Sequence, residues 1–306
     1  PVAPLLVNLG VRYEISKQWV DYYTDGGKAE RSELNKNDLF PSLNMKYQMN
    51  EKNSLRFAFS RTVTRPSFIE MAPFLYQESY GSAQIRGNAD LQNGYNYNID
   101  LRYELFEKNG DMLSITAYYK HLKAPIERVQ TLSGGSAVHS FRNADNGMAT
   151  GVEIEFRKEI VKDLRFGVNG SYMYTNVKLP EGGAYTNSQR ALQGASPYLA
   201  NADLTYSPAF SNDRQLSVAL LYNLQGPRIH SVGISGLGDI KQQPVHTLNF
   251  TGSYRFNRRF AVKLQVNDLL NQDILFKQEV PTTGDKVEVE RFRKGTGFEV
   301  GFSYDL

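Results

Sequence analysis

The chain has 306 residues, with 35 lysines and arginines against 32 acidic residues and no cysteine. Its net charge of +3 is spread along the chain without a basic block. This distribution argues against a nucleic-acid partner, and the lack of cysteine excludes disulfides and thiolate chemistry. No apolar run approaches the roughly 20 residues that a membrane helix needs. This criterion does not detect membrane β-barrels, because only every second residue of their strands faces lipid.

About twelve segments carry apolar residues at every second position, which is the period of a β-strand. In chain order these stripes run over residues 5–13, 43–49, 55–59, 95–105, 113–119, 152–156, 166–174, 198–206, 216–222, 248–256, 260–266 and 298–306. No segment of comparable length has a helical period. The sequence therefore predicts an all-β chain.

Residues 95–120 show the pattern most clearly. Every odd position from 95 to 105 is tyrosine, isoleucine or leucine, and every even position is asparagine, aspartate, arginine or glutamate. The polar stretch EKNGD at 107–111 then leads into a second alternating segment, so a hairpin is predicted. Its apolar side could cover a soluble core or could face lipid, with the charged side lining a wet interior.

Short and long connections alternate along the chain. Short polar turns lie near residues 50–53, 107–111, 162, 212 and 256–259, whereas long connections run roughly over 16–37, 64–94, 122–147, 175–194, 225–243 and 271–295. Such asymmetry, with strands of about 9 to 11 residues, is typical of outer-membrane barrels, whereas globular sheets have strands of about 5 or 6. The pattern favours a transmembrane antiparallel β-barrel over a large soluble β protein.

In such a barrel the two faces of each strand meet different surroundings. The residues predicted to face lipid are Leu101, Tyr103, Ile154, Phe156, Val262, Leu264, Val300 and Phe302. The residues predicted to face the lumen or a plug are Arg102, Glu104, Glu153, Glu155, Arg157, Lys263 and Glu299. Polarity alone does not separate this arrangement from the solvated outer face of a β-sandwich.

Five segments form a recognisable ordered set. They are RTVTRPSFIEMAPF at 61–74, IRGNADLQNGYNYNIDLRYE at 85–104, NADNGMATGVEIEFRK at 143–158, GASPYLANADLTY at 194–206 and VKLQVNDLLNQ at 262–272. The set resembles the TonB-dependent outer-membrane receptors, and most of all the branch common in Bacteroidota. The chain departs from that family at Ala89, where proline is frequent, at Tyr198, where histidine is frequent, and at Leu306, where many members end in an aromatic residue.

The resemblance implies a barrel of 22 strands around an N-terminal plug. Residues 1–306 would form its C-terminal portion, because nothing in them resembles a plug domain or a TonB box. The implied function is active transport of a scarce nutrient, such as a siderophore, glycan, cobalamin or peptide, without a cofactor or catalysis. The implied partners are the lipid of the cell outer membrane, the plug and remaining barrel strands, TonB and, for glycan or peptide uptake, a surface lipoprotein.

Aromatic and cationic residues of the long connections are candidates for ligand capture, because exposed loops on rigid scaffolds often bind ligands. These candidates are Tyr76, Tyr80, Arg86, Arg128, Arg142, Tyr185, Arg190, Arg228 and His230. The alternative is that they are solvated loop residues or part of an aromatic girdle. The glycine-rich stretches GSAQIRGNAD and SVGISGLGDI are expected to be flexible surface loops, because neither joins a strand to a helix as a phosphate-binding loop does.

Other chemistries have weaker support. The four histidines, at 121, 139, 230 and 246, lack metal-ligand spacing, so no metal site is expected. Glu153 and Glu155 project to one side of a strand, where acid–base catalysis is conceivable but contacts with lumen water or a plug are expected. An outer-membrane enzyme resembling the phospholipase barrel and a soluble β-rich surface-binding protein remain as alternatives.

Overall fold

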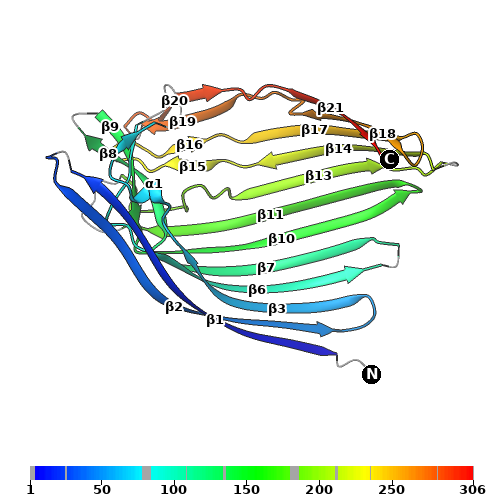
Figure 1. Ribbon diagram of the computed structural model, residues 1–306, viewed down its shortest axis with the longest axis horizontal. Coiled ribbons are helices and arrows are strands. Elements are labelled where there is room, and N and C mark those ends of the chain that lie inside the picture. Colours follow the sequence, from blue (N-terminus) through cyan, green and yellow to red (C-terminus); the bar gives the residue numbers. More distant parts are fainter. Residues whose placement is uncertain are drawn as a thin grey trace.

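A computed structural model describes residues 4–24, 26–77, 84–107, 109–133, 136–179, 186–210, 213–234, 236–280 and 282–305. Its dominant feature is one antiparallel sheet (Figure 1). Along the continuous path of that sheet lie β1 (Leu5–Tyr23), β2 (Ala29–Gln48), β3 (Asn53–Thr64), β6 (Gly94–Phe106), β7 (Met112–Lys123), β10 (Asn146–Val161), β11 (Leu164–Lys178), β13 (Tyr198–Tyr206), β14 (Gln215–Gln225), β17 (Val245–Arg255), β18 (Phe260–Asn267) and β21 (Gly297–Tyr304). The predicted all-β fold of about twelve strands is confirmed.

The sheet is strongly curved and open. Each strand on the path pairs with its predecessor and its successor, while β1 pairs only with β2 and β21 only with β18 among the described residues. Figure 1 places β1 and β21 on opposite sides of the sheet, with both termini at the same end of the strands. The arrangement is that of a barrel wall opened along one seam.

The two ends of the sheet differ, as the sequence predicts. The described residues of connections 49–52, 107–111, 162–163, 207–214 and 256–259 lie at the end that holds the termini. Those of the longer connections, 65–93, 124–145, 179–197, 226–244 and 268–296, lie at the other end. One expectation is wrong. Residues 16–37 are not a loop but continue β1 and β2 as a paired hairpin up to Tyr23↔Ala29. Charged residues among the aromatic ones of this segment conceal its alternation.

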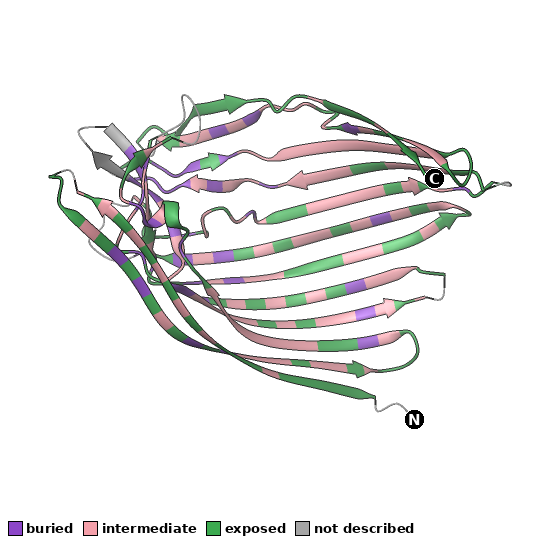
Figure 2. Cartoon of the chain, in the orientation of Figure 1, coloured by how far each residue is buried: buried purple, intermediate pink, exposed green. Residues whose placement is uncertain are grey.

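The long connections contain secondary structure of their own. One small sheet comprises β15 (Arg228–Ser231), β16 (Ile240–Gln242), β19 (Ile274–Val280) and β20 (Asp285–Phe292), and another comprises β4 (Leu75–Tyr76), β5 (Ile85–Arg86), β9 (Ser136–Asn143) and β8 (Ile126–Ser133). Ser67 and Glu70 form a capping box for the short α1 (Phe68–Met71). No helix in the described parts of the chain is long and apolar enough to cross a membrane. Buried residues concentrate at this end of the molecule (Figure 2).

Strand register separates the two predicted sets of wall residues. Across β6, β7, β10 and β11, one row reads Leu101, Ala117, Val152, Tyr172, and the adjacent row reads Arg102, Thr116, Glu153, Ser171. Because adjacent residues of a strand point to opposite faces, these rows lie on opposite sides of the sheet. The same holds in β18 and β21, where Leu264 pairs with Val300 and Gln265 with Glu299.

Ion pairs connect neighbouring strands on the polar face. Glu104 accepts a hydrogen bond from Nε of Arg56 at 2.7 Å and forms an ion pair with Arg102 at 2.9 Å. Arg102 also approaches Glu155 at 3.8 Å, and Glu155 pairs with Arg157 at 2.7 Å. The charges therefore alternate in sign over β3, β6 and β10, so no large field of one sign develops on this face.

Candidate functional site

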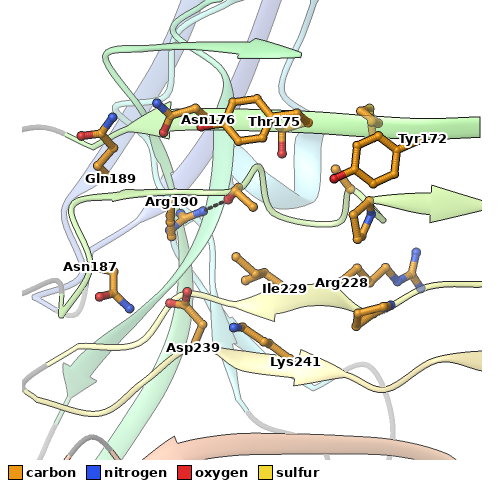
Figure 3. Close-up of a pocket in the computed structure, with 16 residues that line it drawn as sticks. Tyr172, Thr175, Asn176, Asn187, Gln189, Arg190, Arg228, Ile229, Asp239 and Lys241 are labelled. Atoms are coloured by element: carbon orange, nitrogen blue, oxygen red, sulfur yellow. Dashed lines mark hydrogen bonds between the residues drawn. The ribbon is translucent and has the colours of Figure 1, made fainter. Parts of the chain in front are cut away.

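A cavity of about 620 Å³ lies between the main sheet and the small sheet that contains β15 and β16 (Figure 3). It is lined by Tyr172–Asn176 of β11, by Asn187 and Gln189–Ala191 around β12 (Gln189–Arg190), by Ala195 and Pro197, by Pro227–Ile229 at the start of β15, and by Asp239 and Lys241 around β16. Residues far apart in sequence thus meet in one concave site at the elaborate end of the wall. Such sites are the usual place for ligand binding.

The cavity exists because the wall is incomplete beside β11. β13 begins at Tyr198, opposite Tyr172, whereas β12 pairs only with Val177 and Lys178. Met173–Asn176 pair with β10 on one edge, but on the other edge no strand of the described residues pairs with them. On that edge Met173 donates its N–H to the carbonyl of Pro197 at 2.8 Å. Both faces of β11 therefore contribute side chains to the lining, with Tyr172 and Tyr174 on one face and Met173 and Thr175 on the other.

A buried ion pair forms the rear of the cavity. Arg190 donates from Nη2 to Oε2 of Glu127 at 2.7 Å, and the two side chains are 4% and 0% exposed. Nη1 of Arg190 donates to the Ala191 carbonyl at 2.8 Å, which is the bond drawn in Figure 3. Burial raises the pKa of Glu127 above its ordinary value, and Arg190 opposes that rise. The pair fixes β12 against β8, because a buried charge is tolerated only beside its partner.

Gln193 connects β8 to β15. Its Oε1 accepts from the backbone N–H of Arg128 at 3.3 Å, and its Nε2 donates to the carbonyl of His230 at 2.8 Å. The two strands also bond directly, since the N–H of Gln130 donates to the carbonyl of Val232 at 3.1 Å. A small apolar core of Val129, Ala144, Val177, Leu179 and Val232 lies beneath these contacts. The cavity is therefore built on a packed support.

Positive charge predominates around the cavity. Arg228 and Lys241 line it against the single carboxylate of Asp239, while the charge of Arg190 is already matched by Glu127. Asp239 accepts from the N–H of Gly233 at 2.9 Å, and Arg228 donates from Nε to Gln242 at 2.8 Å. With the amide side chains of Asn187 and Gln189 beside these cations, the site suits an anionic ligand with polar oxygens. Tyr172 and Tyr174 line it from the apolar face of β11.

A buried histidine lies in the support of the cavity. His139 of β9 is 4% exposed, and its Nδ1 accepts from Nε of Arg128 at 3.0 Å. Burial, together with Arg128 and His230, lowers the pKa of His139 to about 3. The ring centroids of His139 and His230 lie 6.0 Å apart. Folding thus unites two histidines that are distant in sequence, yet the described residues contain no group of three or more metal-ligating side chains.

The chain matches the model of the outer membrane protein beta-barrel family over residues 5–304. It belongs to this family. Residues 1–306 are thus part of an outer-membrane β-barrel, so the alternative of a soluble β-rich protein is wrong.

Two kinds of relatives resemble this outer-membrane barrel protein. The ferric enterobactin receptor of Pseudomonas aeruginosa is 21% identical over 270 residues, which cover 81% of this chain and 35% of that receptor. Among solved structures, the ferric yersiniabactin uptake receptor FyuA of Yersinia pestis superposes with a TM-score of 0.66 at 14% identity, covering 99% of this chain and 43% of FyuA. A mutant of the P. aeruginosa receptor PfeA with enterobactin gives 0.60 at 18% identity, covering 97% and 45%. The chain thus spans less than half of each relative, and the structural matches establish its fold.

The predicted capture residues of this barrel protein divide into three groups. Arg190 and Arg228 line the cavity, whereas Arg128 on β8 and His230 on β15 do not line it. Tyr76, Arg86 and Arg142 lie in the sheet of β4, β5, β9 and β8 and do not line the cavity. Tyr80 and Tyr185 lie outside the described residues. Ligand capture by any of the nine stays a prediction.

Sequence reasoning missed Glu127, Gln193, Asp239 and Lys241. The signal for Glu127 was the β-branched residues of IERVQTL, which favour a strand inside a presumed loop although its apolar positions do not alternate. The stretch SVGISGLGDI was expected to be a surface loop, but Ser231 and Val232 have no exposed surface. That expectation is wrong because the segment packs against β8, a contact that glycine content does not reveal.

Replacing Glu127 by Gln should loosen the support of the cavity. The change leaves Arg190 buried without a counter-charge, which costs about 3 to 5 kcal/mol. We expect the free energy of local opening to fall by this amount at the amides of Arg128 and Gln130, measured by hydrogen exchange on the purified protein. The double variant Glu127→Gln/Arg190→Met should recover most of the loss, because no buried charge is left unpaired. Unchanged exchange in the single variant would contradict a structural role for the pair.

The same support should weaken in acid because of His139. Its pKa is about 3 when folded and 6.5 when exposed, so the open form binds protons more readily below pH 6.5 and the folded form loses stability as pH falls. The opening free energy of the β8–β9 hairpin should decrease by about 1.4 kcal/mol per pH unit between those values. Hydrogen exchange at several pH values, corrected for intrinsic rates, measures this slope. His139→Gln should abolish it and His121→Gln should not; a slope that persists in His139→Gln assigns the effect to another group.

Proposed function

We propose that the protein is an outer-membrane receptor that captures a scarce nutrient at the end with the long connections and passes it inward through the barrel, driven by TonB. The carrying observation is the cationic cavity, which lies beside a charged wall face in a member of an outer-membrane barrel family. The plug, the remaining barrel strands and TonB are the partners this function needs. Strands beside β1 and β21 would satisfy edge groups that cannot be left bare in lipid.

The function requires that the apolar face meets lipid. On the apolar face of β6, β7, β10 and β11, the rows of paired residues contain no acidic side chain. These rows extend from the one that holds Leu105, Leu113, Phe156 and Val168 to the one that holds Tyr95, Lys123, Asn146 and Lys178. The opposite face of the same strands carries Asp100, Glu104, Glu153 and Glu155. Carboxylates are costly against acyl chains, so their segregation supports lipid on the first face and water or a plug on the second.

Cysteine labelling tests this orientation in native outer membranes. Leu101→Cys and Ile154→Cys should resist a water-borne maleimide because acyl chains cover them. Glu155→Cys should react in the absence of a plug, and all three should react after unfolding. Ready modification of both apolar positions in the folded protein would reverse the assignment of the faces.

The substrate we propose is an anionic iron–siderophore complex. The relatives named above are a ferric enterobactin receptor and a ferric yersiniabactin uptake receptor, and the cavity combines the cations of Arg228 and Lys241 with amide side chains. Cations that approach a ligand anion directly form charge-assisted hydrogen bonds, which are stronger than neutral ones. This chemistry supports capture without any bond-breaking step.

Uptake of a ferric tris-catecholate tests the proposal. Cells whose only route for this complex is the full-length protein should lose uptake when it is deleted or when the proton gradient is collapsed. Arg228→Ala/Lys241→Ala should weaken binding about tenfold or more, at roughly 1 kcal/mol for each exposed charge contact. Arg258→Ala, at the short-turn end, should bind normally. Normal uptake in the deletion strain would reject this substrate.

A further inference from the structure

The two small sheets join edge to edge. Val129 of β8 and Val232, the residue after β15, form a parallel bridge, and the N–H of Val232 donates to the carbonyl of Arg128 at 3.3 Å. Through this contact eight strands follow one another in the order β4, β5, β9, β8, β15, β16, β19 and β20. They form a collar at the long-connection end of the wall. Like the wall, the collar is open, with β4 and β20 as its end strands among the described residues.

β20 presents a free backbone edge. The carbonyl of Glu279 accepts from the N–H of Gly238 at 2.9 Å, so Glu279 directs its backbone groups away from β20 and toward β16. Its partner across the β19–β20 ladder is Lys286. Because the two residues of an antiparallel pair point their backbone groups either toward each other or apart, Lys286 directs its own away from β19, and the alternation gives Glu288 the same direction. No strand in the described part of the chain pairs with this edge.

The side chains of β20 also lack cover. All eight residues of the strand are exposed, and Val287 and Val289 keep 50% and 45% of their surface in solvent. Edge strands that remain in water are commonly very short or contain proline, and β20 is neither short nor interrupted by proline. Arg291 donates to Glu288 from Nε at 2.8 Å and from Nη2 at 2.6 Å, so these two charges neutralise each other. The edge therefore has the features that an added β-strand requires.

β20 lies where the wall is incomplete. It belongs to the connection between β18 and β21, and β21 is an end strand of the wall in the described residues. Figure 1 shows β20 and β21 along the same margin of the molecule. Every pairing along the wall is antiparallel, so a strand added to β21 runs toward the long-connection end. The alternation of short and long connections then predicts a long connection of that strand beside β20.

We propose that β20 binds, by β-strand addition, the long connection that follows the wall strand paired with β21. This occupant is a segment of the same protein outside residues 1–306. The chain covers less than half of each relative named above, so those relatives have the length that such a segment needs. The inference rests on the completed barrel of the proposed function, but not on the transported substrate.

The added strand would connect the cavity to the other part of the barrel. Arg228 of β15 and Lys241 of β16 line the cavity, and both strands belong to the small sheet that ends at β20. Backbone hydrogen bonds along β20 would hold this sheet from its second edge, while β8 holds it from the first. The position of the two cations would then depend on both parts of the barrel.

Hydrogen exchange and cross-linking on the full-length protein in mild detergent test the added strand. The outward amides of Lys286 and Glu288 should exchange at least about tenfold more slowly than in an unfolded chain, because the added strand bonds to them. A benzophenone amino acid in place of Val289 should cross-link, on illumination, to a peptide of the same molecule from outside residues 1–306. Mass spectrometry identifies that peptide.

Proline substitution separates the two edges of β20. Lys286→Pro removes an N–H that points away from β19, so the cross-linked segment should lose protection about fivefold while the amides that pair β19 with β20 stay protected. Lys286→Ala keeps this N–H and should behave as the wild type does. Protection of the cross-linked segment that is unchanged by Lys286→Pro would contradict strand addition at this edge.

The outcomes also separate this inference from the proposed function. Free exchange at Lys286 and Glu288 in the wild type, the absence of an intramolecular cross-link, or cross-links that reach only a second copy or a different protein would each overturn the added strand. Protected outward amides in β21, together with normal ferric tris-catecholate uptake, would leave the completed barrel intact in that case. Free exchange at both strands would count against the completed barrel as well. The wild-type measurements remain decisive if Lys286→Pro folds poorly.

Discussion

Continuous backbone pairing is the constraint on which the rest of this structure depends. In lipid, a strand can satisfy its N–H and C=O groups only through its neighbours, so the register of each pair cannot drift. Here the pairing is unbroken from β1 to β21, and it determines every row across the wall. A shift of one residue between two strands would carry Glu155 or Glu104 onto the face that now holds Ile154 and Tyr103. The register between neighbouring strands therefore determines which face carries the charged side chains as well as the shape of the sheet.

The two faces of the wall differ in how charged side chains are distributed. On the polar face, Arg56, Arg102 and Arg157 alternate with Glu104 and Glu155, so each ion has a neighbour of opposite sign. On the apolar face of β6, β7, β10 and β11, charge is absent from the middle rows and appears as lysine at one margin. Short turns suffice at the end holding the termini, while the other end carries two additional sheets and nearly all of the buried side chains.

The loop sheets behave as a small folded unit attached to the wall. Glu127 and Arg190 place a buried ion pair where a solvent-exposed loop would carry none, and Gln193 bonds to both β8 and β15. Such a pair contributes little net stability but penalises every arrangement that separates the charges. The cavity is consequently held in one shape by Arg190, which lines it, and by Glu127 and Gln193, which do not. The missing strand pairing beside Met173–Asn176 gives the same cavity its opening.

The sequence by itself determined the approximate number of strands in the wall and the alternation of short and long connections. It also placed residues such as Leu101 and Glu155 on opposite faces of the wall. It could do so because strand period and turn chemistry are local. Only the tertiary structure showed that residues 16–37 extend a hairpin, that His139 approaches His230, and that Glu127 meets Arg190 across 63 positions of sequence. These outcomes depend on which long connections pack together, and no local pattern encodes that choice.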